Sequence, residues 1–168
     1  MKDIGDGNYH VEVYGQSKDC YLKDIRYGPS DGLDDGFTVS KGSPANLEIT
    51  ISSRGARLQG TASDEDGLPA ADVWVVLVPS APHRSHHRLY KSLTTDQYGH
   101  FDLRGIAPGD YKLFSWNQVE DGAWEDADFL KPFEEKGEKV TVLEGDAKSV
   151  NLTTIKTAGT EEQKPDNK

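Results

Sequence analysis

The segment 94–116, with the sequence TTDQYGHFDLRGIAPGDYKLFSW, constrains the fold more than any other part of the chain. Apolar and polar residues alternate along it, with Phe101 and Leu103 on one face of one predicted strand and Tyr111 and Leu113 on one face of the next. Turns containing glycine or proline separate these runs, as they do between antiparallel strands that follow one another directly. The segment therefore predicts a β-meander.

Two further turn motifs precede the meander, GTA at 60–62 and DGLPAADV at 66–73. Together with the meander they resemble the carboxypeptidase regulatory-like domain, over residues 54–155. The resemblance implies an all-β fold, an antiparallel sandwich of the Ig-like or transthyretin-like type. It also implies an extracytoplasmic bacterial protein, located in the periplasm, on the cell surface or in the medium. In metallocarboxypeptidases this module carries neither zinc ligands nor the catalytic glutamate, so the resemblance implies a chain that is not an enzyme.

An internal repeat indicates a second, incomplete copy of the same fold. GNYHVEV at 7–13 resembles GDYKLFS at 109–115, and FTVSKG at 37–42 resembles VTVLEG at 140–145. Alternating strands are expected to close the copies, at 47–51 and 150–155. The first copy lacks the residues that precede Tyr111 in the second, which leaves open whether its missing strands come from this chain or from a neighbour.

The repeat and the local patterns together predict three segments. We expect a partial β-sandwich at 1–53, the carboxy-terminal half of a repeat, followed by the regulatory-like sandwich at 54–156 and a disordered tail at 157–168. One short helix is predicted near 126–137. The apolar residues of the first segment alternate as sandwich strands do, but we expect them to have no facing sheet within this chain.

The composition limits the partners and cofactors of the chain. A formal net charge of −10 argues against nucleic acid and against anionic membrane surfaces. The longest apolar run, 73–78, is far too short to cross a bilayer, and the amino terminus lacks the apolar stretch of a signal peptide. Cys20 is the single cysteine, so no intrachain disulfide can form. No glycine-rich nucleotide motif is present, and no cofactor is predicted.

Two polar clusters have the residue types of metal sites. His83, His86 and His87 lie close in sequence, but the cluster contains no cysteine or carboxylate, and we interpret it as a solvated basic loop. The acidic string 64–67 has the D-x-D-G pattern of a calcium loop, but Val75 stands where the closing glutamate is required. A turn explains that string, so the sequence predicts no metal ligand.

Aromatic and acidic residues supply the remaining candidates. Trp116 and Trp124 flank a polar loop, and we expect both to be exposed and available for contact with a glycan. The acidic residues between 120 and 128 are predicted to be solvated, because a loop filled with like charges lacks the opposed environments that a catalytic pair needs. No catalytic residue is predicted.

The sequence therefore predicts a non-catalytic structural or interaction module. Its partners would be other domains of a larger protein or other copies of the chain. Two alternatives remain open, a glycan-binding β-sandwich that takes polysaccharide, and a subunit of a surface assembly or filament completed by strands from a neighbouring chain.

Overall fold

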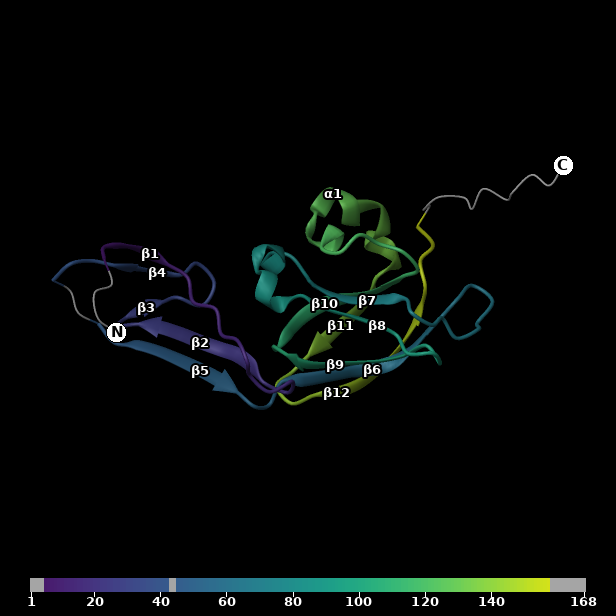
Figure 1. The fold of residues 1–168 in the computed structure, drawn as a ribbon, viewed down its shortest axis with the longest axis horizontal. Coiled ribbons are helices and arrows are strands. Elements are labelled where there is room, and N and C mark those ends of the chain that lie inside the picture. Colours follow the sequence, from purple (N-terminus) through teal and green to yellow (C-terminus); the bar gives the residue numbers. More distant parts are fainter. Residues whose placement is uncertain (1–4, 43–44, 158–168) are drawn as a thin grey trace. The chain divides into compact units, whose positions relative to one another are not determined.

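The computed structural model describes residues 5–42 and 45–157 (Figure 1). The protein is all-β, with one short α-helix, as the sequence predicted. Its residues divide into two compact units. Unit 1 comprises the chain up to Arg57 together with Arg104–Gly109 and Thr141–Lys148, and unit 2 comprises Leu58–Leu103, Asp110–Val140 and the residues from Ser149 onward.

Unit 1 contains two small sheets. Strands β1 (Gly7–Tyr9) and β4 (Phe37–Val39) form an antiparallel pair. Strands β2 (Tyr21–Tyr27), β3 (Ser30–Asp31) and β5 (Leu47–Ser52) form a sheet in the order β3-β2-β5, all antiparallel. One pair of the repeat is shared by the two copies, because β1 pairs with β4 as β10 (Gly109–Trp116) pairs with β11 (Glu138–Val142) in unit 2. The closing strands differ, because β5 pairs with β2 whereas the last strand of unit 2 does not follow this order.

The two sheets of unit 1 meet through aromatic packing. The Phe37 ring on β4 stacks on the Tyr27 ring of β2, with centroids 4.8 Å apart and planes 19° apart. Ile25, two residues before Tyr27, is fully buried. The prediction that the first segment has no facing sheet is therefore wrong in part, because β1 and β4 supply a two-stranded cover over β2.

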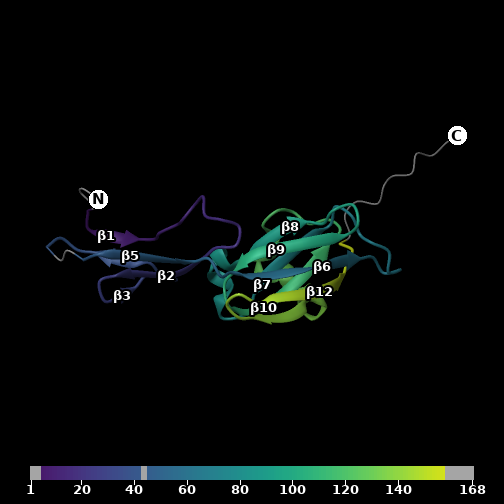
Figure 2. The same ribbon diagram turned by 90° about the horizontal axis from the view of Figure 1, so that it is seen from below.

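Unit 2 is a β-sandwich of two antiparallel sheets, apart from strand ends that belong to unit 1 (Figure 2). One sheet has the order β11-β10-β7-β8 and the other β12-β6-β9. The remaining strands of these sheets are β6 (Ala56–Ser63), β7 (Trp74–Pro79), β8 (Lys91–Thr94), β9 (His100–Ile106) and β12 (Ala147–Thr153). The succession of β8, β9 and β10 confirms the predicted alternation of strands and turns across 94–116.

The core of unit 2 contains the residues that the period-two alternation selected. Val75, Leu77 and Leu113 have no exposed surface, and Phe101 and Leu103 are each 4% exposed. Leu77 lies opposite Leu113 in the β7–β10 register. Burying these side chains removes apolar surface from water, which is the main favourable contribution to folding.

A helical segment covers a second, aromatic part of the core. It runs through η3 (Ala123–Glu125), α1 (Ala127–Leu130) and η4 (Lys131–Lys136), which confirms a short helix near 126–137. The Asp126 carboxylate accepts a hydrogen bond from the Asp128 N–H at the start of α1, as an N-cap residue does. We name the segment 123–136 the helical cap.

The predicted division at residues 53 and 156 stays a prediction. The predicted tail lies outside the described residues, apart from Thr157. Among the residues that the structure describes, no helix is long and apolar enough to cross a membrane.

Candidate functional site

Both tryptophans chosen as glycan contacts are buried. Trp116 has no exposed surface and Trp124 is 3% exposed, so the expectation that they are exposed is wrong. The Trp116 ring stacks on Phe114 at a centroid distance of 4.9 Å and contacts Phe129 and Phe133 of the helical cap at 5.8 Å each. The cap therefore covers the tryptophan face that a sugar would have to reach.

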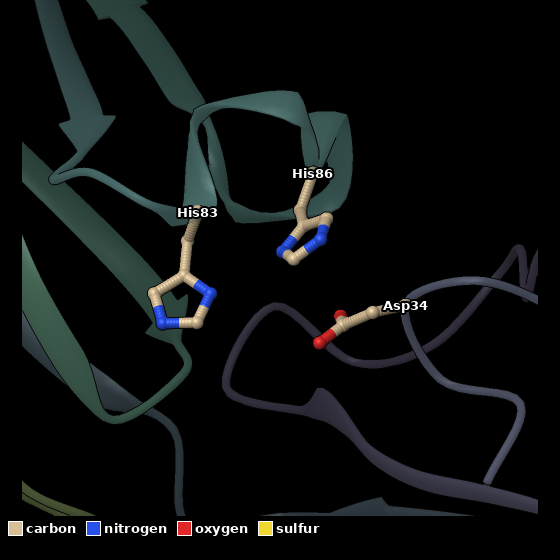
Figure 3. A group of neighbouring side chains, drawn as sticks. All are labelled: Asp34, His83 and His86. Atoms are coloured by element: carbon tan, nitrogen blue, oxygen red, sulfur yellow. The ribbon is translucent and has the colours of Figure 1, made fainter.

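The histidine loop brings two imidazoles together. His83 lies in η1 (His83–Ser85), and its ring centroid is 5.4 Å from that of His86 (Figure 3). Asp34, the third side chain labelled there, belongs to unit 1, so unit 2 itself supplies only the two imidazoles of that group. His87, in η2 (His87–Leu89), places Nδ1 2.6 Å from Glu125 Oε2. Sequence reasoning missed this partner because Glu125 is remote in the chain.

Two aspartates in turns, Asp64 and Asp96, accept hydrogen bonds from backbone N–H groups. Asp64 Oδ1 accepts hydrogen bonds from the N–H groups of Asp66 and Leu68, at 3.0 and 2.9 Å. Asp96 Oδ1 accepts from Tyr98 and His100 in the same way, and these hydrogen bonds lower the pKa of Asp96. The interpretation of 64–67 as a turn fits this geometry, since Asp side chains commonly close turns by bonding the backbone two residues on.

One carboxylate joins the helical cap to the sheet beneath it. Glu134 lies 2.5 Å from Arg84 Nη1 and 2.6 Å from Lys112 Nζ, and Lys112 also donates to the Glu134 carbonyl at 2.7 Å. The hydrogen bond from Arg84, with that from Lys112, lowers the pKa of Glu134 to about 2. The cap is therefore attached by charge as well as by aromatic packing.

A second carboxylate collects three donors within unit 1. Glu144 Oε1 accepts from Ser52 Oγ at 2.7 Å, Tyr21 Oη at 2.9 Å and Lys23 Nζ at 3.0 Å. These hydrogen bonds, with that from Ser52 the largest cause, lower the pKa of Glu144 to about 2. Sequence reasoning missed the cluster, since 92 positions separate Glu144 from Ser52 and no local pattern links them.

Unit 1 exposes apolar side chains on strand β5. Ile49 and Ile51 on β5 are 42% and 43% exposed. Ile49 lies directly opposite Ile25 in the β2–β5 register, and Ile25 is fully buried. Residues opposite each other in an antiparallel pair share a face, so Ile49 lies on the inner face of the sheet with Ile25. Ile51, two residues further along β5, lies on the same face. The cover that shields Ile25 leaves Ile49 and Ile51 exposed. We name Leu47, Ile49 and Ile51 the β5 surface and take it as the candidate site.

No family model matches the chain, and no curated protein matches it. Solved structures do match. A Pseudomonas aeruginosa protein assigned provisionally to carbohydrate binding is 20% identical, with 59% of this chain and 88% of that chain covered and a TM-score of 0.38. The Klebsiella pneumoniae 5-hydroxyisourate hydrolase is 17% identical, with 61% and 87% covered and a TM-score of 0.36. A streptococcal ancillary pilin is 14% identical, with 89% of this chain but less than half of the pilin, 45%, covered and a TM-score of 0.40.

These matches correct one prediction. An enzyme, the hydroxyisourate hydrolase, is among the matching structures, which contradicts the expectation that the protein is not an enzyme. The absence of catalytic residues from a related module does not transfer to a chain of this fold, because function resides in sites placed on a fold and not in the fold itself. At these identities the matches assign neither a reaction nor a ligand to this chain.

Proposed function

We propose that the chain is an interaction module of the carboxypeptidase regulatory-like kind, and that it binds another polypeptide through the β5 surface of unit 1. The partner would be another domain of a larger protein or a component of a surface assembly. The resemblance of residues 54–155 to modules of exported bacterial proteins supports an extracytoplasmic location for this function.

The exposure of Ile49 and Ile51 is the observation that carries the proposal. Both side chains lie on an inner sheet face, where apolar residues are normally covered, yet each exposes more than two fifths of its surface. Clustered apolar residues that remain open to water commonly mark contact surfaces for other proteins. The strand that carries them, LEITIS, contains neither proline nor lysine, the residues that usually protect an open strand from pairing.

Site-specific photo-crosslinking in the source cells tests this function. A photoreactive phenylalanine analogue at position 51 should give a discrete crosslinked species of higher mass, because the partner lies against that side chain. The same analogue at Leu143, which is 65% exposed, is the matched control and should give none. Equal crosslinking from both positions, or none from position 51, would contradict the proposal. Fractionation of the same cells tests the location, since an exported module should be recovered outside the cytoplasm.

Trp116 and Trp124, the residues predicted to contact a glycan, do not support the alternative function of glycan binding. Sugar-binding sandwiches stack carbohydrate rings on open aromatic faces, whereas Trp116 and Trp124 are buried under the helical cap. Tyr98, at 60% exposed, is the aromatic residue of unit 2 with an open face. Binding to a polysaccharide that Tyr98→Ala abolishes would restore this function.

A further inference from the structure

We infer that His83 and His86 of unit 2 together bind a late first-row transition-metal ion, with Cu²⁺ held more tightly than Zn²⁺. The two imidazoles are the protein ligands, and solvent completes the coordination of the ion. The inference departs from the sequence prediction of no metal ligand in this loop. It goes beyond the proposed function, because it concerns unit 2 alone and makes no use of the β5 surface.

The backbone of the loop turns both imidazoles to the same side. The His86 N–H donates a hydrogen bond of 3.1 Å to the His83 carbonyl, which closes the 3₁₀ turn η1. Side chains three residues apart eclipse each other in such a turn. The sequence alone does not reveal this arrangement, because in an extended chain the same two side chains would point to opposite faces. The local fold therefore creates a pair that the spacing does not indicate.

The separation of the two rings suits a shared ion. Their centroids are 5.4 Å apart, and the nitrogen that each ring offers to a metal lies within 4.8 Å of the other. In Figure 3 both rings project from the loop to the same side. Bonds from an ion to imidazole nitrogen are about 2.0–2.1 Å long, so an ion bonded to both nitrogens needs them about 3–4 Å apart. Small rotations of the two side chains reach that separation.

Contacts within unit 2 hold the loop in this shape. Tyr90 is buried, and its hydroxyl donates a hydrogen bond of 2.9 Å to the carbonyl of Arg84, the residue that follows His83. The Arg84 guanidinium lies 2.5 Å from a carboxylate oxygen of Glu134 in the helical cap. A preformed pair of ligands loses less conformational freedom when it binds than ligands on a mobile chain, which increases the affinity.

The surroundings of the pair admit a cation. His83 is exposed and His86 is partly exposed, so an ion can reach both rings from solution. The positive charge of Arg84 next to His83 opposes the approach of a cation, but the Glu134 carboxylate offsets it. A net charge of −10 attracts cations to the chain as a whole.

The type of ligand determines which ions fit. Imidazole nitrogen suits copper, nickel and zinc, whereas Mg²⁺ and Ca²⁺ prefer oxygen ligands. For a given set of nitrogen ligands, affinity among the divalent ions is highest for Cu²⁺ and lower for Zn²⁺. We therefore expect Cu²⁺ to give the tightest complex and Mg²⁺ to give none.

Titration of the full chain with Cu²⁺ tests the inference. The chain is used without an affinity tag, because the histidines of a tag bind the same ions. Calorimetry should show one tightly bound Cu²⁺ per chain, and the electron paramagnetic resonance spectrum of the bound ion should show coupling to the nitrogens of both imidazoles. Zn²⁺ should bind more weakly at the same place and shift the ring proton resonances of His83 and His86. Mg²⁺ should give no binding heat.

Substitution of single histidines identifies the ligands. His83→Gln and His86→Gln should each weaken Cu²⁺ binding by at least about tenfold, since the loss of even an outer partner of a metal site has an effect of that size. His100→Gln is the matched control, because His100 is also an exposed histidine of unit 2 but lies beside Asp96 in another turn, and its affinity should be unchanged. Thermal unfolding without metal should be the same for all three variants, since none of them removes a buried side chain.

Three results would overturn the inference. They are unchanged Cu²⁺ affinity in His83→Gln or His86→Gln, an equal loss of affinity in His100→Gln, and a resonance spectrum with coupling to a single imidazole. His87 lies in the same loop with Nδ1 2.6 Å from Glu125. His87→Gln should therefore weaken binding less than either substitution in the pair, and an equal loss there would also overturn the assignment of the ion to His83 and His86.

Discussion

Leu77 and Leu143 differ sharply in burial and form a matched pair for a test of stability. Leu77 has no exposed surface and lies opposite Leu113 between paired strands. Leu77→Ala should lower the free energy of unfolding by about 2–5 kcal/mol, because it removes buried methyl groups and leaves a cavity. Leu143→Ala, at a side chain that is 65% exposed, should change it by less than about 0.5 kcal/mol. Urea denaturation of both variants measures the difference, and a loss at Leu77 no larger than at Leu143 would contradict the strand register.

Glu144 gives a second prediction for a single residue. Its pKa is lowered from 4.5 to about 2, so its hydrogen bonds stabilise unit 1 above about pH 4.5, and this contribution is lost as the pH falls toward about 2. Ser52→Ala should raise the pKa of Glu144, because the hydrogen bond from Ser52 is the largest cause of the shift. Lys23→Gln should raise it as well, because it removes a positive charge beside the carboxylate. Carboxyl NMR titration measures both variants, and an unchanged titration midpoint in Ser52→Ala would contradict the geometry of the cluster.

Among the structural elements, the end of the helical cap packs closely on the sheet beneath it, because Gly137, the residue after the cap, lies against Phe114 of β10. A Cβ added at Gly137 would lie 2.5 Å from the Phe114 ring, and the backbone there has an ordinary φ of −76°. Gly137→Ala should therefore cost about 1–3 kcal/mol through overpacking. Gly5→Ala is the control, since a Cβ at Gly5 would contact nothing within 4 Å. Thermal unfolding measures both, and equal stability of the two variants would show that the cap moves aside without cost.

The elements also show what sequence patterns can and cannot predict. Period-two alternation located β9 and β10 and selected Phe101, Leu103 and Leu113 as core, because neighbouring strands in a meander contact each other directly. The polar loop that follows Trp116 led to the wrong expectation that this side chain is exposed, because no local pattern indicates that the helical cap folds back over it. The Glu144 cluster was missed for the same reason, because its donors lie far away in the sequence.

At the scale of the whole molecule, the two units differ in how much of each is buried. Unit 2 buries a sandwich core and an aromatic cluster beneath the cap, whereas strands β1–β5 of unit 1 bury three large apolar side chains, those of Tyr21, Ile25 and Phe37. We expect amides of β2 and β5 to exchange through a partial opening of lower free energy than the global unfolding that controls β7 and β10. Native-state hydrogen exchange across a denaturant series measures this, and equal opening free energies in both units would show that the chain unfolds as one cooperative body.

The composition of unit 1 has a consequence for the order in which a ribosome builds it. Its strands are encoded first, but the carboxylate that accepts hydrogen bonds from Tyr21, Lys23 and Ser52 belongs to Glu144, which is translated 92 to 123 residues later. The segments Arg104–Gly109 and Thr141–Lys148 also belong to this unit. Unit 1 of a nascent chain therefore cannot form its complete set of contacts when its first strands are made. Its apolar strands are synthesised before their hydrogen-bond acceptor, and unit 1 can be completed only after most of the second sandwich has left the exit tunnel.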